Sequence, residues 1–147
     1  MADAPHILIV EAPYYTHISA ELVKGATAAL EAAQATHERI SVPGAFEIPA
    51  AIRFASQTKR YDGFVALGCV IRGETTHYDY VCGESARGLQ NLGLEQGLAI
   101  GFGILTVENE AQALARAGVD KRNKGGEAAN ACLAMVALKR RFGLAPR

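Results

Sequence analysis

Tryptophan is absent from the 147-residue sequence, and only three cysteines are present. Cys69, Cys82 and Cys132 lie far apart along the chain and form no Cys-x-x-Cys pair, so they predict neither a disulfide scaffold nor a zinc site. Cys69 stands within an apolar run, where we expect a buried, unreactive thiol. Such cysteine usage is typical of a reducing compartment, so we expect a cytoplasmic protein.

Long apolar runs and an excess of charge are missing too. No stretch of about 18 apolar residues is present, so no membrane span is expected. The first residues lack the basic start and apolar core of a signal peptide. Fifteen basic residues balance fifteen acidic ones, which removes the usual electrostatic argument for binding nucleic acid or an anionic membrane surface. A local anion site remains compatible with this balance.

Two further kinds of site have no sequence support. His6, His17 and His37 show no ligand spacing with one another, and no carboxylate or thiolate cluster is present, so we expect no metal. The glycines match neither a Walker A loop nor a dinucleotide-binding fingerprint. The pattern around Gly101 and Gly103 lies inside a strand-like run and resembles a nucleotide loop only weakly.

What the sequence does contain is a regular alternation of strand-like apolar runs and segments of helical period. Strands are predicted over residues 7–10, 39–42, 64–71 and 99–105. Helices are predicted over residues 18–30, 47–57 and 77–92, from 109 onward, and through 128–141. This order is typical of an α/β fold. Right-handed crossovers favour a flavodoxin-like three-layer sandwich with a central four-stranded parallel sheet, in one domain over residues 1–147.

Signals for helix ends refine this scheme. Gly93 is expected near the end of the third helix, and Gly143 can close the last one. Asn109 and Gln112 predict a capping box, with asparagine in place of the usual serine or threonine. The last helix is expected to present one face that carries Ala128, Cys132, Met135 and Val136.

Ligands of such sheets bind beyond the carboxyl ends of the strands, and the first loop there holds two tyrosines. Tyr14 and Tyr15 follow the first strand. They either form a stacking platform for a flat heterocycle or pack ordinarily at the strand end. The second loop contains Gly44, which permits unusual backbone angles, and Glu47. The Glu47 carboxylate either accepts hydrogen bonds from ligand hydroxyls or interacts with the helix dipole.

The third loop, RGETTHYD at residues 72–79, carries the most polar groups. Its glycine, hydroxyl residues and helix start predict an oxyanion or phosphate cradle. Alternatively, Thr76 caps the helix and Asp79 supports its first turn, and both interpretations can hold together. His77 is the one histidine in such a loop, and imidazole side chains in general suit proton exchange near neutral pH. A lone histidine is nevertheless more often structural.

A basic stretch follows in the last third of the chain, and it comprises Arg116, Lys121, Arg122 and Lys124. Most such runs are solvated surface. Their alternative role is to bring charge-assisted hydrogen bonds to a phosphate.

Taken together, the loops resemble the lumazine synthase (6,7-dimethyl-8-ribityllumazine synthase) family, over nearly the whole chain. The segments that carry the resemblance are PGAFEIP at 43–49, ALGCVIRGETTHYDYV at 66–81, GILTVEN at 103–109, RAG at 116–118 and NKG at 123–125. The resemblance implies a transferase of riboflavin biosynthesis without a redox cofactor or metal. It condenses 5-amino-6-ribitylamino-pyrimidinedione with 3,4-dihydroxy-2-butanone 4-phosphate and releases phosphate and water. Positioning of the two reactants, assisted by proton transfer, is its expected contribution.

The resemblance also implies roles for individual residues. Tyr14 matches the aromatic position that stacks on the pyrimidine, although Pro13 and Thr16 depart from the family's usual pattern and leave Tyr15 as an alternative. The residues that match the segment around the ribityl chain are Ala45, Phe46 and Glu47. Glu47 is expected to accept hydrogen bonds from the ribityl hydroxyls.

Further positions match the family's contacts to the ring and the phosphate. Val70 and Ile71 match backbone contacts to the heterocycle. The residues that match the phosphate-binding turn are Gly73, Glu74 and Thr75. For Glu74 only the backbone N–H is expected to contribute, because its carboxylate would repel the phosphate.

Four more residues complete the implied site. His77 matches the proton-transfer residue. The residues that match groups supplied by the neighbouring subunit are Phe102, Arg116 and Lys124. Arg116 is expected to pair with the phosphate. An active site between subunits follows.

The resemblance implies a homo-oligomer and an association with riboflavin synthase. We expect a homopentamer, because few residues precede the first strand and Arg122 replaces a glycine that is frequent in shell-forming members. Two alternatives stand beside the enzyme. A non-catalytic protein that binds flavin or lumazine would share the fold but would not need His77. A flavodoxin-like signalling domain would need an acidic cluster at the strand ends, where the sequence offers Glu11 alone.

Overall fold

The computed structural model describes residues 3–144 and contains a four-stranded parallel sheet with the order β2-β1-β3-β4. The strands are β1 (His6–Glu11), β2 (Thr36–Ser41), β3 (Gly63–Ile71) and β4 (Ile100–Val107). Every neighbouring pair of strands runs parallel. All carboxyl ends of the strands therefore lie along one rim of the sheet.

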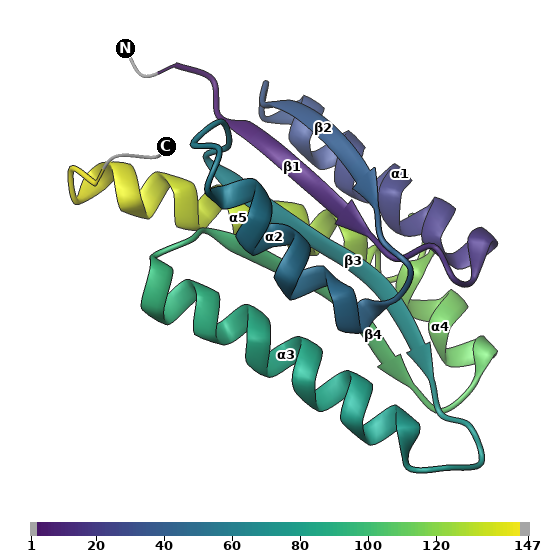
Figure 1. Cartoon of the computed structure of the whole chain (residues 1–147). Helices are drawn as coiled ribbons and strands as arrows, with labels where there is room; N and C mark the ends of the chain where they lie inside the picture. Colours follow the sequence, from purple (N-terminus) through teal and green to yellow (C-terminus); the bar gives the residue numbers. More distant parts are fainter. Residues whose placement is uncertain (1–2, 145–147) are drawn as a thin grey trace.

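Helices cover both faces of this sheet and complete three layers (Figure 1). The helices are α1 (Thr16–Ala32), the 3-10 turn η1 (Ala45–Glu47), α2 (Ile48–Ser56), α3 (His77–Gln96), α4 (Glu110–Ala117) and α5 (Lys124–Arg141). In Figure 1, α2 and α3 lie in front of the sheet, and α1, α4 and α5 lie behind it. The predicted order of elements and the flavodoxin-like α/β sandwich are confirmed.

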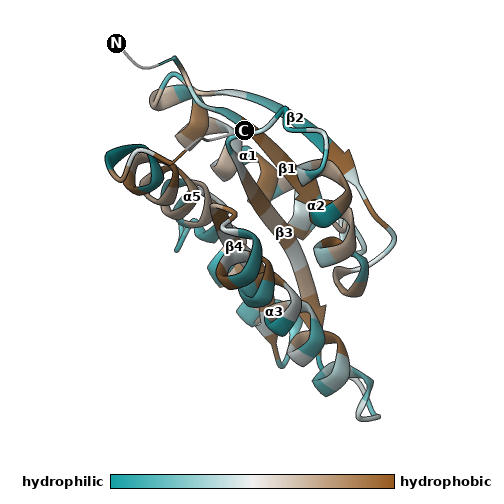
Figure 2. Ribbon diagram, turned by 60° about the vertical axis from the view of Figure 1, so that its left-hand side comes forward, coloured by the Kyte–Doolittle hydropathy of each residue, from teal (hydrophilic) through white to brown (hydrophobic). Residues whose placement is uncertain are grey.

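Alternation along the strands explains why two cores form. Ile7 and Ile9 of β1 point into the core beneath α1 and α5, whereas Leu8 and Val10 point into the core beneath α2 and α3. All four side chains are buried. A strand covered on both faces must be apolar at every position, and Figure 2 shows β1 and β3 in brown between helices with teal outer sides.

Glycines allow the last helix to approach the sheet closely. An added Cβ at Gly101 of β4 would collide with the backbone oxygen of Ala128, and one at Gly125 would collide with that of Leu22. A side chain at either position would push α5 away from β4 or α1. The close packing of these elements therefore depends on two glycines.

The second strand differs from its predicted position. We predicted residues 39–42, but β2 runs from Thr36 to Ser41 and pairs with β1 from His6↔Thr36 onward. β2 is an edge strand with mostly exposed side chains, and much of it is teal in Figure 2. Because hydrogen bonding to β1 fixes this strand, its apolar pattern was a poor guide to its bounds.

The third helix is longer than predicted. Gly93 lies inside α3, which continues to Gln96 and ends at Gly97 in the left-handed conformation, with φ +67°. Thr76 precedes this helix but makes no side-chain capping bond, so the prediction that it caps the helix was wrong. Instead, the hydroxyl of Thr75 accepts from the His77 N–H at 3.3 Å.

Two other helix ends agree with the sequence. The Asn109 side chain accepts from the Gln112 N–H at 2.9 Å, and the Gln112 side chain accepts in turn from the Glu108 N–H at 2.8 Å. The capping box is confirmed, with its return bond one residue earlier than usual. Gly143 adopts φ +73° just beyond α5, as expected of a closing glycine. On α5, however, Met135 is 45% exposed and does not share the buried face predicted for it.

Candidate functional site

The loops that follow β1, β2 and β3 meet at one rim of the sheet, because these strands are neighbours and run parallel. The 3-10 turn η1, which follows β2, contacts both β3 and α3. The structure thus brings together the three loops in which we predicted Tyr14, residues 45–47 and residues 70–77. All of these sites face the same end of the molecule.

In the first loop, Tyr14 is 74% exposed, whereas Tyr15 is partly buried against the core beneath α1. Burial raises the pKa of Tyr15, with smaller contributions from Cys69 and Tyr14. Tyr15 therefore keeps a neutral hydroxyl at neutral pH, and only the Tyr14 ring presents a large surface to a ligand. This arrangement favours Tyr14 over Tyr15 as a stacking residue.

In the second loop, Ala45 is buried, and Phe46 and Glu47 are exposed. Gly44 has φ −156°, which is ordinary extended backbone. The unusual backbone angles that a glycine permits are therefore not adopted at this position. A Cβ there would lie 3.2 Å from the Glu47 Oε1 atom, so Gly44 instead leaves room for the carboxylate. Glu47 directly precedes α2 and makes no side-chain capping bond, which leaves its oxygens free to accept from a ligand.

The third loop offers several unpaired donors. Within residues 3–144, the backbone N–H groups of Gly73, Glu74 and Thr75 have no hydrogen-bond acceptor, and these residues are exposed. A Cβ built on Gly73 would meet no atom within 4 Å. Free N–H groups before a helix start suit an anion, since the helix dipole adds partial positive charge there. The predicted phosphate cradle is thus geometrically open.

His77, the first residue of α3, differs from the other histidines. The rings of His6, His17 and His37 lie within 2.8 to 3.5 Å of carboxylate oxygens. The His77 imidazole is exposed and has no hydrogen-bond or ion-pair partner in the described part of the chain. An unpaired imidazole beside an anion cradle is free to exchange a proton with a ligand.

Val70 and Ile71 form the last residues of β3 and are half-buried. Both side chains pack against the cores, Val70 on the α2 side and Ile71 on the α1 side. Because the side chains face the cores, it is the backbone groups of these two residues that are available to a ligand at the rim. This placement is compatible with the backbone contacts to the heterocycle that we predicted.

Three predicted residues lie on other surfaces. Phe102 sits in the middle of β4, opposite Ala66, and is 50% exposed. Arg116 bonds to its own helix, with Nη1 3.0 Å from the Gln112 carbonyl, and Lys124 pairs with Glu127 at 3.0 Å. Arg116 and Lys124 belong to α4 and α5, which cover the opposite face of the sheet from α3 (Figure 1).

Phe102 also lines an apolar groove of about 520 Å³ beside β4. The other lining residues are Ala86, Leu89, Gln90, Gly93, Leu94, Leu98, Ile100 and Met135. An exposed apolar surface of this kind is typical of a contact between protein chains. This groove explains why Met135 remains unburied in the single chain.

The cysteines are structural in character. Burial is the main reason why the pKa of Cys69 is raised to about 11 and that of Cys132 to about 12. Both thiols stay protonated near neutral pH and are poor nucleophiles. The expectation of an unreactive Cys69 is consistent with this environment.

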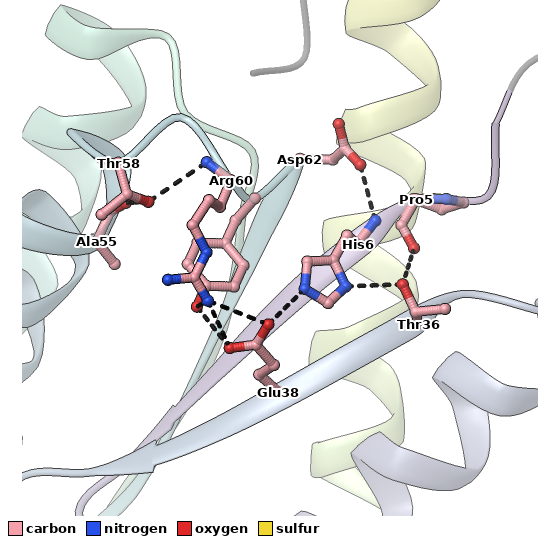
Figure 3. A network of polar contacts seen from close by, with 9 residues as sticks. Pro5, His6, Thr36, Glu38, Ala55, Thr58, Arg60 and Asp62 are labelled. Atoms are coloured by element: carbon pink, nitrogen blue, oxygen red, sulfur yellow. Dashed lines mark hydrogen bonds and ion pairs between the residues drawn. The ribbon is translucent and has the colours of Figure 1, made fainter.

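A second polar cluster lies at the opposite rim, where the strands begin (Figure 3). His6 contacts Thr36 at 2.7 Å and Glu38 at 2.8 Å, and Glu38 also accepts from Tyr61 and Arg60. Hydrogen bonds from His6 and Tyr61, with the charge of Arg60, lower the pKa of Glu38 to about 2. The hydrogen bonds in this cluster join the starts of β1 and β2 to the segment that leads into β3, so we interpret the cluster as a structural joint between strands.

Two polar groups at the carboxyl rim have partners that the sequence did not predict. Glu11 is buried at the end of β1, with Oε2 2.8 Å from the Arg39 Nε atom. Arg72 reaches Glu108 across the ends of β3 and β4. The parallel register ends at Ile71↔Val107 and sets residues 72 and 108 side by side. A prediction from sequence that β3 pairs with β4 could therefore have revealed the contact between Arg72 and Glu108.

The described residues offer neither a metal cluster nor a membrane-spanning helix. No group of three or more histidine, cysteine or acidic side chains among residues 3–144 is arranged to hold a metal ion. None of the helices in that part of the chain is long and apolar enough to cross a membrane.

The sequence is similar to known proteins over nearly its whole length. Residues 4–140 match the family model described as 6,7-dimethyl-8-ribityllumazine synthase. A protein of that name from Bartonella tribocorum is 60% identical, and the match covers 97% of this chain and 95% of the relative. A second from Sphingopyxis alaskensis is 58% identical, with 95% and 98% covered. A third from Bartonella henselae is 57% identical, with 94% and 90% covered.

Proposed function

Since the chain belongs to the 6,7-dimethyl-8-ribityllumazine synthase family, we propose that it catalyses this family's condensation at the carboxyl rim of its sheet. It is a transferase of riboflavin biosynthesis. The amine of the ribitylamino-pyrimidinedione attacks the ketone of 3,4-dihydroxy-2-butanone 4-phosphate and forms an imine with loss of water. Phosphate then leaves, and ring closure with loss of a second water gives the lumazine.

One observation carries the assignment to this rim. The exposed Tyr14 ring, the unpaired imidazole of His77 and the free N–H groups of residues 73–75 belong to loops after neighbouring strands. A flat heterocycle, a proton-transfer group and a phosphate therefore each find a suitable partner at one end of the sheet. Holding two reactants in this way lowers the entropic part of the barrier.

The pyrimidine substrate is proposed to stack on Tyr14. Its ribityl chain lies along Ala45, Phe46 and Glu47, and the Glu47 carboxylate accepts from the ribityl hydroxyls. The exposure of Phe46 and Glu47 supports this role. The polar edge of the ring meets the backbone groups of residues 70 and 71, at the end of β3.

The phosphate is proposed to lie on the N–H groups of Gly73, Glu74 and Thr75, and His77 transfers protons during imine formation. The exposed Glu74 side chain turns to solvent, so its charge does not oppose the phosphate. Arg116 of a neighbouring protomer supplies a bidentate guanidinium to the same phosphate. No metal or redox cofactor takes part.

The assembly proposed is a homopentamer with a site at each interface. Phe102, Arg116 and Lys124 complete the site of the next protomer, and the apolar groove beside β4 becomes covered. The placement of Phe102 within β4 and of Arg116 and Lys124 on the opposite face of the sheet from α3 supports this division. In a head-to-tail ring, each protomer presents one surface to one neighbour and a different surface to the other. We also propose an association with riboflavin synthase, a cytoplasmic location and a single domain over residues 1–147.

Purified protein mixed with both substrates tests the function. Lumazine absorbance and phosphate release are expected to rise together and faster than in the spontaneous reaction. Arg116→Ala is expected to raise the KM for the phosphosugar and to leave that for the pyrimidine nearly unchanged. Tight binding of flavin or lumazine without any acceleration would contradict the enzyme and favour a storage or receptor protein.

A further inference from the structure

Arg72, the first residue after β3, joins two parts of the rim through its guanidinium. Its Nε atom lies 2.9 and 3.0 Å from the two carboxylate oxygens of Glu108, which directly follows β4. Its Nη1 atom lies 3.4 Å from the Oδ1 atom of Asp79 in the first turn of α3. The Arg72 N–H also donates to the Val107 carbonyl at 2.9 Å, so the residue is fixed to β4 at both backbone and side chain.

The guanidinium also lies on an aromatic ring. Its central carbon is 4.3 Å from the centroid of Tyr78, the second residue of α3. Such a contact is a cation–π interaction and restrains the orientation of the planar group. Tyr78 is half-buried, unlike the exposed residues around it, so the ring provides a fixed platform.

These contacts enclose a short segment. Residues 73–77 leave the sheet at Arg72 and enter α3 immediately before Tyr78 and Asp79. Within the described chain, residues 73–76 make few hydrogen bonds. The Thr75 hydroxyl accepts from the His77 N–H, and the Thr76 carbonyl accepts from the amides of Asp79 and Tyr80. One guanidinium therefore ties both ends of the loop to the end of β4.

We propose that Arg72 is a positioning residue, which sets the phosphate-binding turn and His77 in register with each other by clamping Tyr78, Asp79 and Glu108. The inference rests on the roles proposed above for residues 73–77. Arg72 acts through the loop and does not itself touch the phosphate. A displacement of about 1 Å in such a loop can cost on the order of 100-fold in rate.

Arginine suits this role for two physical reasons. Its planar fork contacts two carboxylates at once and stacks on a ring, which a lysine ammonium cannot reproduce. It also offsets part of the negative charge that Glu108 and Asp79 bring close to a turn that receives an anion. The hydrogen bond with Glu108, followed by the charges of Glu108 and Asp79, raises the pKa of Arg72, so its charge is permanent.

Arg72 could act by clamping Tyr78, Asp79 and Glu108 or only by balancing nearby negative charge, and these two roles predict different kinetics. Arg72→Gln is expected to lower kcat and raise the KM for the phosphosugar, with a combined loss on the order of 100-fold and an unchanged KM for the pyrimidine. Arg72→Lys restores only part of this loss. The double variant Arg72→Gln/Glu108→Gln removes one unbalanced carboxylate without rebuilding the clamp and is expected to stay as slow as Arg72→Gln. Arg87→Gln on α3, which breaks an exposed pair with Glu84, is the matched control and should behave as wild type.

Hydrogen exchange reports on the clamp without any turnover. The amides of Asp79 and Tyr80 donate to the Thr76 carbonyl, and their exchange is expected to quicken in Arg72→Gln but not in Arg87→Gln. Unchanged kinetics and exchange in Arg72→Gln, or recovery in the double variant, would overturn the proposal. An inactive wild-type protein would instead contradict the proposed function, and the exchange comparison would still decide whether the clamp exists.

Discussion

The rings of Tyr14 and Tyr15 meet edge to face, with their centroids 4.9 Å apart and their planes at 78°. Although the two residues are adjacent in the chain, one lies against the core and the other stands in solvent. Tyr15 thus supports the Tyr14 ring from one side and leaves its other surfaces open. In this geometry, Tyr15 supports the ring of its neighbour, and Tyr14 is the residue available to contact a ligand.

Tyr14→Ala is therefore expected to raise the KM for the pyrimidine by about tenfold, since stacking contributes roughly 1–1.5 kcal/mol. Tyr14→Phe keeps the ring and should remain close to wild type. Steady-state kinetics with the phosphosugar saturating measure both. If Tyr15→Leu raised the KM for the pyrimidine more than Tyr14→Ala did, and both variants were equally stable to heat, Tyr15 would be the residue that stacks on the pyrimidine.

His77→Ala is expected to slow turnover by about 100-fold, the lower range for loss of a general acid or base, with little change in either KM. Because the imidazole has no partner within the described residues, its removal should leave the melting temperature unchanged. His37→Ala, which removes a half-buried histidine near Glu31, is the control. A His77→Ala protein with wild-type kcat would remove this residue from proton transfer.

Glu38 makes stability depend on pH. Hydrogen bonds from His6 and Tyr61 and the charge of Arg60 lower its pKa from 4.5 to about 2 in the folded chain. The folded state therefore binds this proton less readily than the unfolded state, and the stabilisation is present above pH 4.5 and disappears as the pH falls towards 2. Urea unfolding of wild type and Glu38→Gln should differ at pH 7 and converge near pH 2. Added salt should reduce the difference in stability between the two proteins, because the ion pair of Arg60 and Glu38 is solvent-exposed. Equal stabilities of wild type and Glu38→Gln at pH 7 would contradict a stabilising role for the Glu38 carboxylate.

Gly101 should tolerate no side chain. Gly101→Ala places a Cβ against the backbone of Ala128 and is expected to destabilise the fold by about 1–3 kcal/mol, the usual range for overpacking. Gly83→Ala on α3 meets no atom within 4 Å and should stabilise the helix by up to about 1 kcal/mol. Denaturant midpoints compare the pair. A stability loss in Gly83→Ala equal to that in Gly101→Ala would show that close packing is not the cause.

Helices and strands were predictable from sequence wherever burial determines which positions are apolar. Strand β3 is apolar throughout because both of its faces are covered, and α4 begins at a capping residue readable from sequence. Strand β2 was misplaced because it lies at an exposed edge. The end of α3 was misplaced because either of two glycines suits a helix end, and only the backbone distinguishes Gly97 from Gly93.

For the site, residue types were predictable but their partners were not. His77 stood out by its loop, whereas the absence of any partner for its ring within residues 3–144 emerges only from the fold. Arg72 was noted in the third loop but was assigned no role, because its partners, Glu108 and Asp79, come from two different elements. Pairing between β3 and β4 creates that contact, and no local pattern encodes it.

Mixed oligomers test most directly the proposal that two protomers complete each site. Chains carrying Tyr14→Ala/His77→Ala are co-expressed with chains carrying Arg116→Ala, under different affinity tags, and oligomers that contain both are purified. If Arg116 serves the neighbouring protomer, random assembly restores about a quarter of the sites in a head-to-tail ring, and lumazine formation should reach about a quarter of the wild-type rate. Activity no higher than the average of the two separately purified variants would contradict the shared site and place all three groups within one chain.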